Sequence, residues 1–326
     1  MLRNKDEASG SGRFAFTSVI RKAENAAPAL CFSVLTLLLF GSLSFPALFP
    51  KLGAVNMIAA VSLTAFLVPS VLFFVFFHKK ASFMLARPDR GTAKFCIASA
   101  MLLVAAALLT KSIACYISGA SKSDAAALLS GTDYSAAIIC YAVLPAILEE
   151  LVFRGVAFSM YEKSCGGLCA ITATAFFFAM SHFSGAEFIS YFISGLILGT
   201  VAYISRSIIP TIIMHLFNNF AGFYLENAVF KITSESKSGV LAIFLLAAIS
   251  LLLLFWTLTE LENICRKRYL SSGKTSDDIS GQASFVRLLP AGKTVGQAAA
   301  GMIASPFVWA GILLFVVYNI AAFAFR

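Results

Sequence analysis

Nine uninterrupted apolar runs, most of them close to 20 residues long, occupy the greater part of this 326-residue chain. A run of that length crosses the hydrocarbon core of a bilayer as an α-helix, because a helix pairs its backbone N–H and C=O groups where no water is present. The sequence therefore predicts an all-α, polytopic transmembrane helix bundle of about nine spans, or eight if one short run is re-entrant. The predicted spans are residues 27–49, 54–77, 95–117, 134–158, 168–183, 188–204, 208–225, 240–258 and 302–325.

Composition excludes the other broad classes of protein. Hydrophobic residues make up 59% of the chain and charged residues only 13%, which no water-soluble, disordered or collagen-like protein shows. The net charge of +9 does not indicate a nucleic-acid partner, because Lys and Arg lie in short loops between apolar runs and not on one face. The lipid bilayer is the expected surrounding.

Polar and apolar stretches divide the chain into six segments. The segment 1–26 has no apolar region typical of a cleaved signal peptide, so we expect no cleavage there. The segments are a cytoplasmic N-terminal segment (1–26), N-terminal transmembrane helices (27–133), core helices (134–225), an eighth span (226–258), a cytoplasmic loop (259–301) and a C-terminal span (302–326).

The distribution of basic residues predicts the orientation. With nine spans and a cytoplasmic N-terminus, 19 of the 25 Lys and Arg residues fall on the cytoplasmic side, counting Arg154 near the inner end of its span, five fall on the other side, and Lys111 lies within a span. This bias follows the positive-inside rule.

Only four charged residues fall within predicted spans: Lys111, Glu149, Glu150 and Arg154. Charge inside a membrane is unfavourable, so each of these residues needs an explanation. Lys111 lies near the end of its run, and we expect its long stem to carry the ammonium to the interface without a functional role.

The sequence Leu148-Glu149-Glu150-Leu151-Val152-Phe153-Arg154 places two carboxylates about 100° apart around a helix. Glu150 and Arg154 stand four residues apart on one face and can form an ion pair, whereas Glu149 has no local partner. A shielded carboxylate without a cation suits a general base acting on water. Pro145 removes a backbone hydrogen bond and can bend this helix to admit water. The alternative from these residues alone is a charge pair that bridges two helices or lines an ion path.

Two histidines also lie in apolar runs. His182 follows Phe178 by four residues, and Asn219 follows His215 by four, so each pair shares a helix face. A single buried histidine is more often a packing residue than a catalyst, and the two motifs gain weight only together with the charged motif.

The cysteines lie mostly inside apolar runs, where they behave as small hydrophobic residues. We expect no disulfides. For the close pair Cys165 and Cys169, loop packing is preferred over metal binding.

The ordered motifs EExxxR, FxxxH and HxxxN resemble the signature of the CPBP intramembrane protease family, which includes type II CAAX prenyl endopeptidases and bacteriocin-processing or self-immunity (Abi-like) proteins. The resemblance covers about residues 134–225. It implies that Glu149 and His182 activate water to attack a peptide carbonyl, and that His215 and Asn219 stabilise the resulting oxyanion. Glu150 with Arg154 would hold the site in place, and Phe178 would pack or contact an apolar substrate group.

The resemblance also implies an integral, multi-pass protein of a bacterial plasma membrane. Its substrate would be a peptide or membrane protein, such as a prenylated C-terminal tail or a leader peptide. No cofactor is expected, with zinc held by Glu149, His182 and His215 as the alternative. The helices lack the HExxH motif that places two zinc ligands on one face, which favours a metal-free mechanism.

Helix geometry predicts where the site lies. At about 1.5 Å per residue, Glu149, His182 and His215 lie roughly 14, 21 and 10 Å from the inner surface, so we expect a cavity that faces the cytoplasm. Two other functions remain open: an ion-coupled transporter in which the buried Glu and His titrate, and a non-catalytic membrane immunity or scaffold protein.

Overall fold

A computed structural model describes residues 23–77, 88, 90–118, 134–234, 239–271, 300 and 303–324. Every regular element among these residues is a helix, so the chain is an all-α bundle. The helices are α2 (Ala23–Leu48), α3 (Ala54–Ser62), η1 (Leu63–Leu67), α4 (Val68–Phe77), η2 (Arg90–Thr92), α5 (Ala93–Ser118), α7 (Tyr134–Ile138), η3 (Ile139–Val143), α8 (Leu144–Glu150), η4 (Leu151–Ala157), α9 (Phe158–Cys165), α10 (Gly167–Ser181), α11 (Phe188–Ser205), α12 (Ile209–Ser234), α13 (Gly239–Ser271) and α15 (Pro306–Ala324).

Six of the described helical stretches are long and apolar enough to cross a membrane, and the protein is an integral membrane protein. These stretches correspond to six of the nine predicted spans. The other three predicted spans contain the polar motifs: α10 has only 15 residues, α7 to α9 contain buried charges, and α12 contains His215 and three asparagines. The number of spans therefore stays a prediction.

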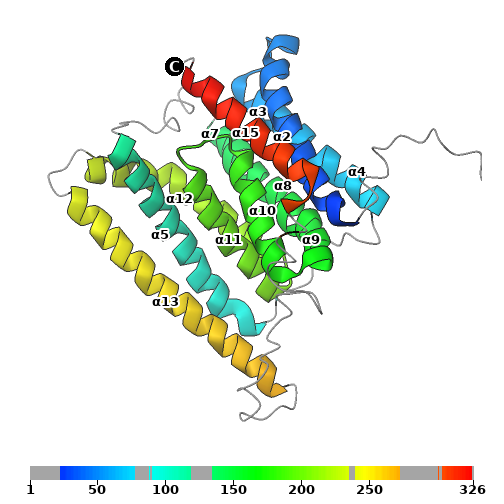
Figure 1. The fold of residues 1–326 in the computed structure, drawn as a ribbon. Coiled ribbons are helices and arrows are strands. Elements are labelled where there is room, and N and C mark those ends of the chain that lie inside the picture. Colours follow the sequence, from blue (N-terminus) through cyan, green and yellow to red (C-terminus); the bar gives the residue numbers. More distant parts are fainter. Residues whose placement is uncertain are drawn as a thin grey trace, which may run out of the picture.

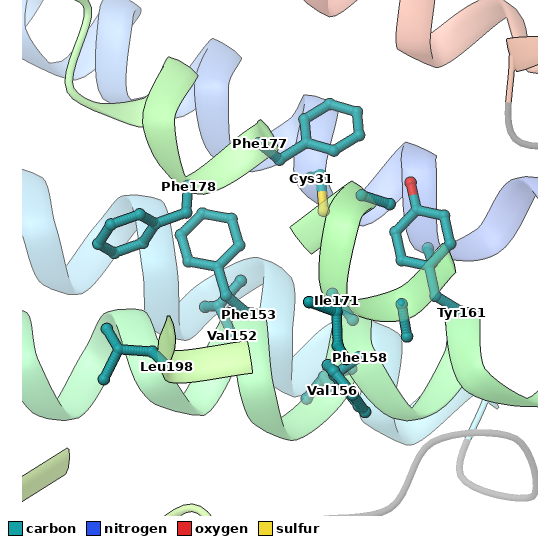
Figure 2. Close-up of a cluster of buried hydrophobic side chains, with 14 of the residues drawn as sticks. Cys31, Val152, Phe153, Val156, Phe158, Tyr161, Ile171, Phe177, Phe178 and Leu198 are labelled. Carbon is teal, nitrogen blue, oxygen red and sulfur yellow. The ribbon is translucent and has the colours of Figure 1, made fainter. Parts of the chain in front are cut away.

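The helices that contain the polar motifs lie at the centre of the bundle. Helix α10 packs against α9 and α11, while α5 packs against α11, α12 and α13 (Figure 1). A buried cluster that includes Phe153, Phe158, Tyr161, Phe177 and Leu198 fills the space between them (Figure 2). By contrast, α13 lies at the periphery and exposes a mainly aliphatic surface, as a helix in contact with lipid does.

The stretch from α7 to α9 is continuous helix with two wider, π-helical sections. The first, η3, ends just before Pro145, which cannot donate a backbone hydrogen bond, so the helix widens there without breaking. The second, η4, contains Arg154. Sections of this kind are frequent at functional sites.

Helix α13 is longer than the predicted eighth span. It continues to Ser271, through 13 residues of the segment predicted as a loop. That part is rich in Leu, Glu, Lys and Arg, which are good helix formers although they are too polar for the bilayer core.

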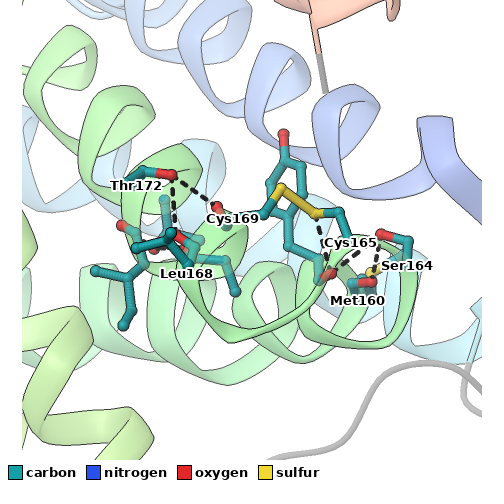
Figure 3. The surroundings of a disulfide bond; sticks show 10 residues. Met160, Ser164, Cys165, Leu168, Cys169 and Thr172 are labelled. Carbon is teal, nitrogen blue, oxygen red and sulfur yellow. Dashed lines mark hydrogen bonds between the residues drawn. A yellow bond between two sulfur atoms is a disulfide. The ribbon is translucent and has the colours of Figure 1, made fainter. Parts of the chain in front are cut away.

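The prediction that no disulfide forms is wrong for one pair. Cys165 and Cys169 are joined, with their Cα atoms 5.7 Å apart (Figure 3). Gly166 lies between them with φ of 89°, a conformation that favours glycine, and it reverses the chain between α9 and α10. This reversal brings the two thiols within bonding distance of each other. The sequence prediction treated them as two separate packing residues.

Gly195 sets the spacing between α10 and α11. A Cβ atom at this position would lie 2.7 Å from Ala175 Cα, so alanine would force the two backbones apart. We expect Gly195→Ala to lower the free energy of unfolding by about 1–3 kcal/mol, measured by denaturation in mixed micelles. Gly199→Ala is the matched control on the same helix, because its nearest contact would be an ordinary 3.4 Å. Equal stability of the two variants would contradict this role of Gly195.

Candidate functional site

A cavity of about 360 Å³ lies between α5, α8, α10, α11 and α12. Five of the seven residues predicted for the site line this cavity: Glu149, Phe178, His182, His215 and Asn219. The other two, Glu150 and Arg154, lie directly behind it with no exposed surface. Three motifs that are far apart in the sequence therefore meet at one place.

The two adjacent glutamates have different surroundings, as their spacing predicts. Glu150 Oε1 accepts a hydrogen bond from Arg154 Nη1 at 2.6 Å, which confirms the predicted ion pair. Arg154 Nη2 also donates to the Gly195 carbonyl at 3.2 Å. The Oε2 atom of each glutamate has no hydrogen-bond partner among the described residues, but only Glu149 lines the cavity. The Glu150 carboxylate is therefore held in a buried ion pair, while the Glu149 carboxylate reaches the cavity.

His215 lies between the two carboxylates. Its Nδ1 is 3.0 Å from Glu150 Oε1, and its Nε2 is 4.0 Å from Glu149 Oε2. The ion-paired Glu150 can only accept, so Nδ1 carries the proton. The second distance is too long for a hydrogen bond, so Nε2 is not bonded to Glu149. His215 lines the cavity, where Nε2 can contact a ligand.

His182 is fixed by two contacts at the end of α10. Its Nδ1 donates to the Phe178 carbonyl at 2.9 Å, because a carbonyl oxygen can only accept. Its ring stacks on Tyr191 with the ring centroids 3.6 Å apart. In the neutral ring this arrangement leaves a lone pair on Nε2, so His182 can accept a proton.

Phe178 connects the charged and aromatic parts of the site. Its ring lies edge to face with His182 and His215, at centroid distances of 5.0 and 5.6 Å. The Arg154 guanidinium lies 4.6 Å from the same ring centroid. Because Phe178 is only 2% exposed, these contacts indicate a packing role more than contact with an apolar ligand.

Asn219 lies one helical turn beyond His215 on α12. Its Nδ2 donates to the Ala142 carbonyl at 3.2 Å, which fixes the amide and leaves its second N–H for another acceptor. Two further polar atoms of the cavity lining have no hydrogen-bond partner in the described part of the chain: Tyr141 Oη and Asn218 Oδ1. Buried polar groups are normally paired, so these atoms mark a place where a polar ligand can bind.

Sequence reasoning missed several residues that line the cavity. Lys111, expected to have no role, is one of them, and its position inside a predicted span was the signal that could have identified it. The others had no distinguishing motif. The missed polar and aromatic residues are Lys111, Tyr141, Ser190, Tyr191, Ser194 and Asn218.

The zinc alternative does not fit this geometry. Among the described residues, no group of three or more His, Cys, Asp or Glu side chains could hold a metal ion. A zinc site needs at least three such ligands around one point, and Glu149, His182 and His215 do not form that arrangement. The metal-free mechanism stays a prediction.

One comparison with known proteins gives a match. Residues 132–221, a little over a quarter of the chain, match the family model described as type II CAAX prenyl endopeptidase Rce1-like. All seven predicted site residues fall inside this segment. The match confirms the resemblance predicted from the sequence and indicates, in general terms, a membrane protease of the CAAX type. No curated protein and no solved structure matches the chain significantly.

Proposed function

We propose that the protein is an intramembrane endopeptidase that hydrolyses a peptide bond by glutamate-activated water, without a metal ion. The observation that carries this proposal is that Glu149, His182, His215 and Asn219 line one cavity inside an apolar bundle. A carboxylate, two imidazoles and an amide supply proton acceptors and oxyanion donors from separate helices. The expected substrate is a peptide or a membrane-protein segment, such as a leader peptide or a C-terminal tail.

In the proposed reaction, Glu149 takes a proton from water as the water oxygen attacks the peptide carbonyl. His182, with a lone pair on Nε2, assists this transfer. The proton then passes to the leaving amine as the C–N bond breaks, so that atoms and charge balance. Shielding by the surrounding helices strengthens these interactions relative to bulk water.

His215 and Asn219 would stabilise the oxyanion of the tetrahedral intermediate. Because His215 already donates to Glu150 through Nδ1, it can also donate from Nε2 only in its doubly protonated form. Glu150 would position His215, and Arg154 would hold Glu150.

The cytoplasmic N-terminus proposed for the chain rests on the bias of basic residues, whereas the bacterial plasma membrane rests on the family resemblance. It bears on substrate choice, because it decides which compartment can supply the peptide.

The proposal is tested with purified protein in detergent and a panel of internally quenched fluorogenic peptides, with and without a chelator. We expect cleavage that the chelator does not reduce. Loss of cleavage in chelator, with recovery on adding zinc, would overturn the metal-free part. Absence of cleavage together with Glu149-dependent proton flux in liposomes would overturn the peptidase proposal in favour of a transporter.

A further inference from the structure

The cavity extends from the middle of the bundle toward one end. Its residues on α5 run from Val104, near the middle of that helix, to Lys111 in the second half, and on α10 it includes His182 at the C-terminal end. On α11 it begins in the first turn, at Ser190 and Tyr191. These parts are nearest to the α10–α11 connection, which lies at the same end as the C-terminal part of α15 (Figure 1).

The opposite end of the same helices is closed by the hydrophobic core. Beyond Glu149, the residues Val152, Phe153, Val156 and Phe158 have no exposed surface. They belong to one buried cluster with Ile171 and Phe177 of α10 (Figure 2), and the Phe158 ring contacts Tyr203 near the end of α11. This layer separates the cavity from the α9–α10 turn.

The two ends differ strongly in charge. Of the described basic residues outside the cavity and the core ion pair, two belong to the end nearest the cavity: Lys51 and Lys231. The closed end has seven: Arg90, Lys94, Lys163, Arg206, Arg266, Lys267 and Arg268. The positive-inside rule assigns the richer end to the cytoplasm.

We infer that the cavity is reached from the extracytoplasmic side of the membrane, and that its substrate is an exported peptide or the extracytoplasmic flank of a membrane protein. The sequence-based expectation of a cytoplasm-facing cavity and that of a cytoplasmic N-terminus are thus incompatible in this fold. His182 follows the last residue of α10, at the end opposite the α9–α10 turn, so a distance of roughly 21 Å from the inner surface places it nearer the outer surface. The inferred substrate rests on the proposed peptidase function, whereas the inferred side from which the cavity is reached does not.

One observation favours the opposite orientation. The disulfide between Cys165 and Cys169 lies at the closed, basic end, and disulfides persist mainly in oxidising compartments. This evidence comes from one place in the chain, because the two cysteines lie within a single turn, and both are only 6% exposed. The charge bias, by contrast, is spread over several separate connections, so it has the greater weight for orientation.

The test is thiol labelling of the full chain in right-side-out and inside-out membrane vesicles with a membrane-impermeant maleimide that shifts the protein on a gel. The parent variant has alanine at the five cysteines outside the disulfide. Ala107→Cys and Ala221→Cys report on the cavity. Lys51→Cys and Lys267→Cys are exposed controls at the two ends.

We expect the two cavity variants to shift with Lys51→Cys in right-side-out vesicles, and Lys267→Cys to shift only in inside-out vesicles. Labelling of the cavity variants only in inside-out vesicles would overturn the inference, and so would labelling in neither. The readout needs no proteolysis, so its failure is separate from failure of the peptidase proposal.

Discussion

Replacing Glu149 with glutamine should lower kcat for peptide cleavage by roughly 10²- to 10⁴-fold, the usual contribution of a positioned general base. The amide is nearly isosteric but cannot take a proton from water. Since Glu149 makes no hydrogen bond through Oε2 with the described residues, the thermal stability of the variant should stay close to that of the wild type. The measurement is kcat in detergent, with unfolding temperature as the companion readout.

Glu162→Gln is the matched control for this prediction. Glu162 lies in the same helical stretch but forms a surface ion pair with Arg206, away from the cavity. Its replacement should leave kcat unchanged, because exposed ion pairs contribute little even to stability. An unchanged kcat in Glu149→Gln would remove Glu149 from the reaction.

Replacing Arg154 with leucine should lower the free energy of unfolding by about 3–5 kcal/mol, because it leaves the Glu150 carboxylate buried without its cation. Both side chains are fully buried, 2.6 Å apart. Denaturation in mixed micelles measures this loss. Arg206→Leu, which breaks the surface pair, should have an effect of about 1 kcal/mol or less.

The double variant Glu150→Leu/Arg154→Leu separates charge burial from packing. Removing both charges should restore much of the stability lost in Arg154→Leu. It should not restore activity, because His215 loses the acceptor of its Nδ1 proton. Stability of Arg154→Leu close to that of the wild type would contradict the structural role of the ion pair.

Local spacing predicted the parts of the site that depend on helix periodicity. Glu150 and Arg154 form an ion pair because side chains four residues apart on one helix are neighbours. Phe178 contacts His182 for the same reason. The all-α fold followed from the apolar runs. In each case the interaction is set within one helix, so the sequence contains it directly.

Contacts between different helices could not be predicted from the sequence in the same way. Lys111 reaches the cavity because α5 packs against α11 and α12, and nothing near it in the sequence shows this packing. The disulfide depends on a chain reversal at Gly166. The apolar run predicted the C-terminal end of α10 within two residues, but it did not show which helices enclose His182 at that end.

The most direct test of the central claim, that the cavity residues act as one catalytic unit, is kcat for Glu149→Gln, His182→Gln and the double variant. Residues that share one proton transfer show non-additive losses. We predict that the double variant is no slower than the slower single variant. Losses that multiply in the double variant would show that Glu149 and His182 act independently, and would contradict this account of the site.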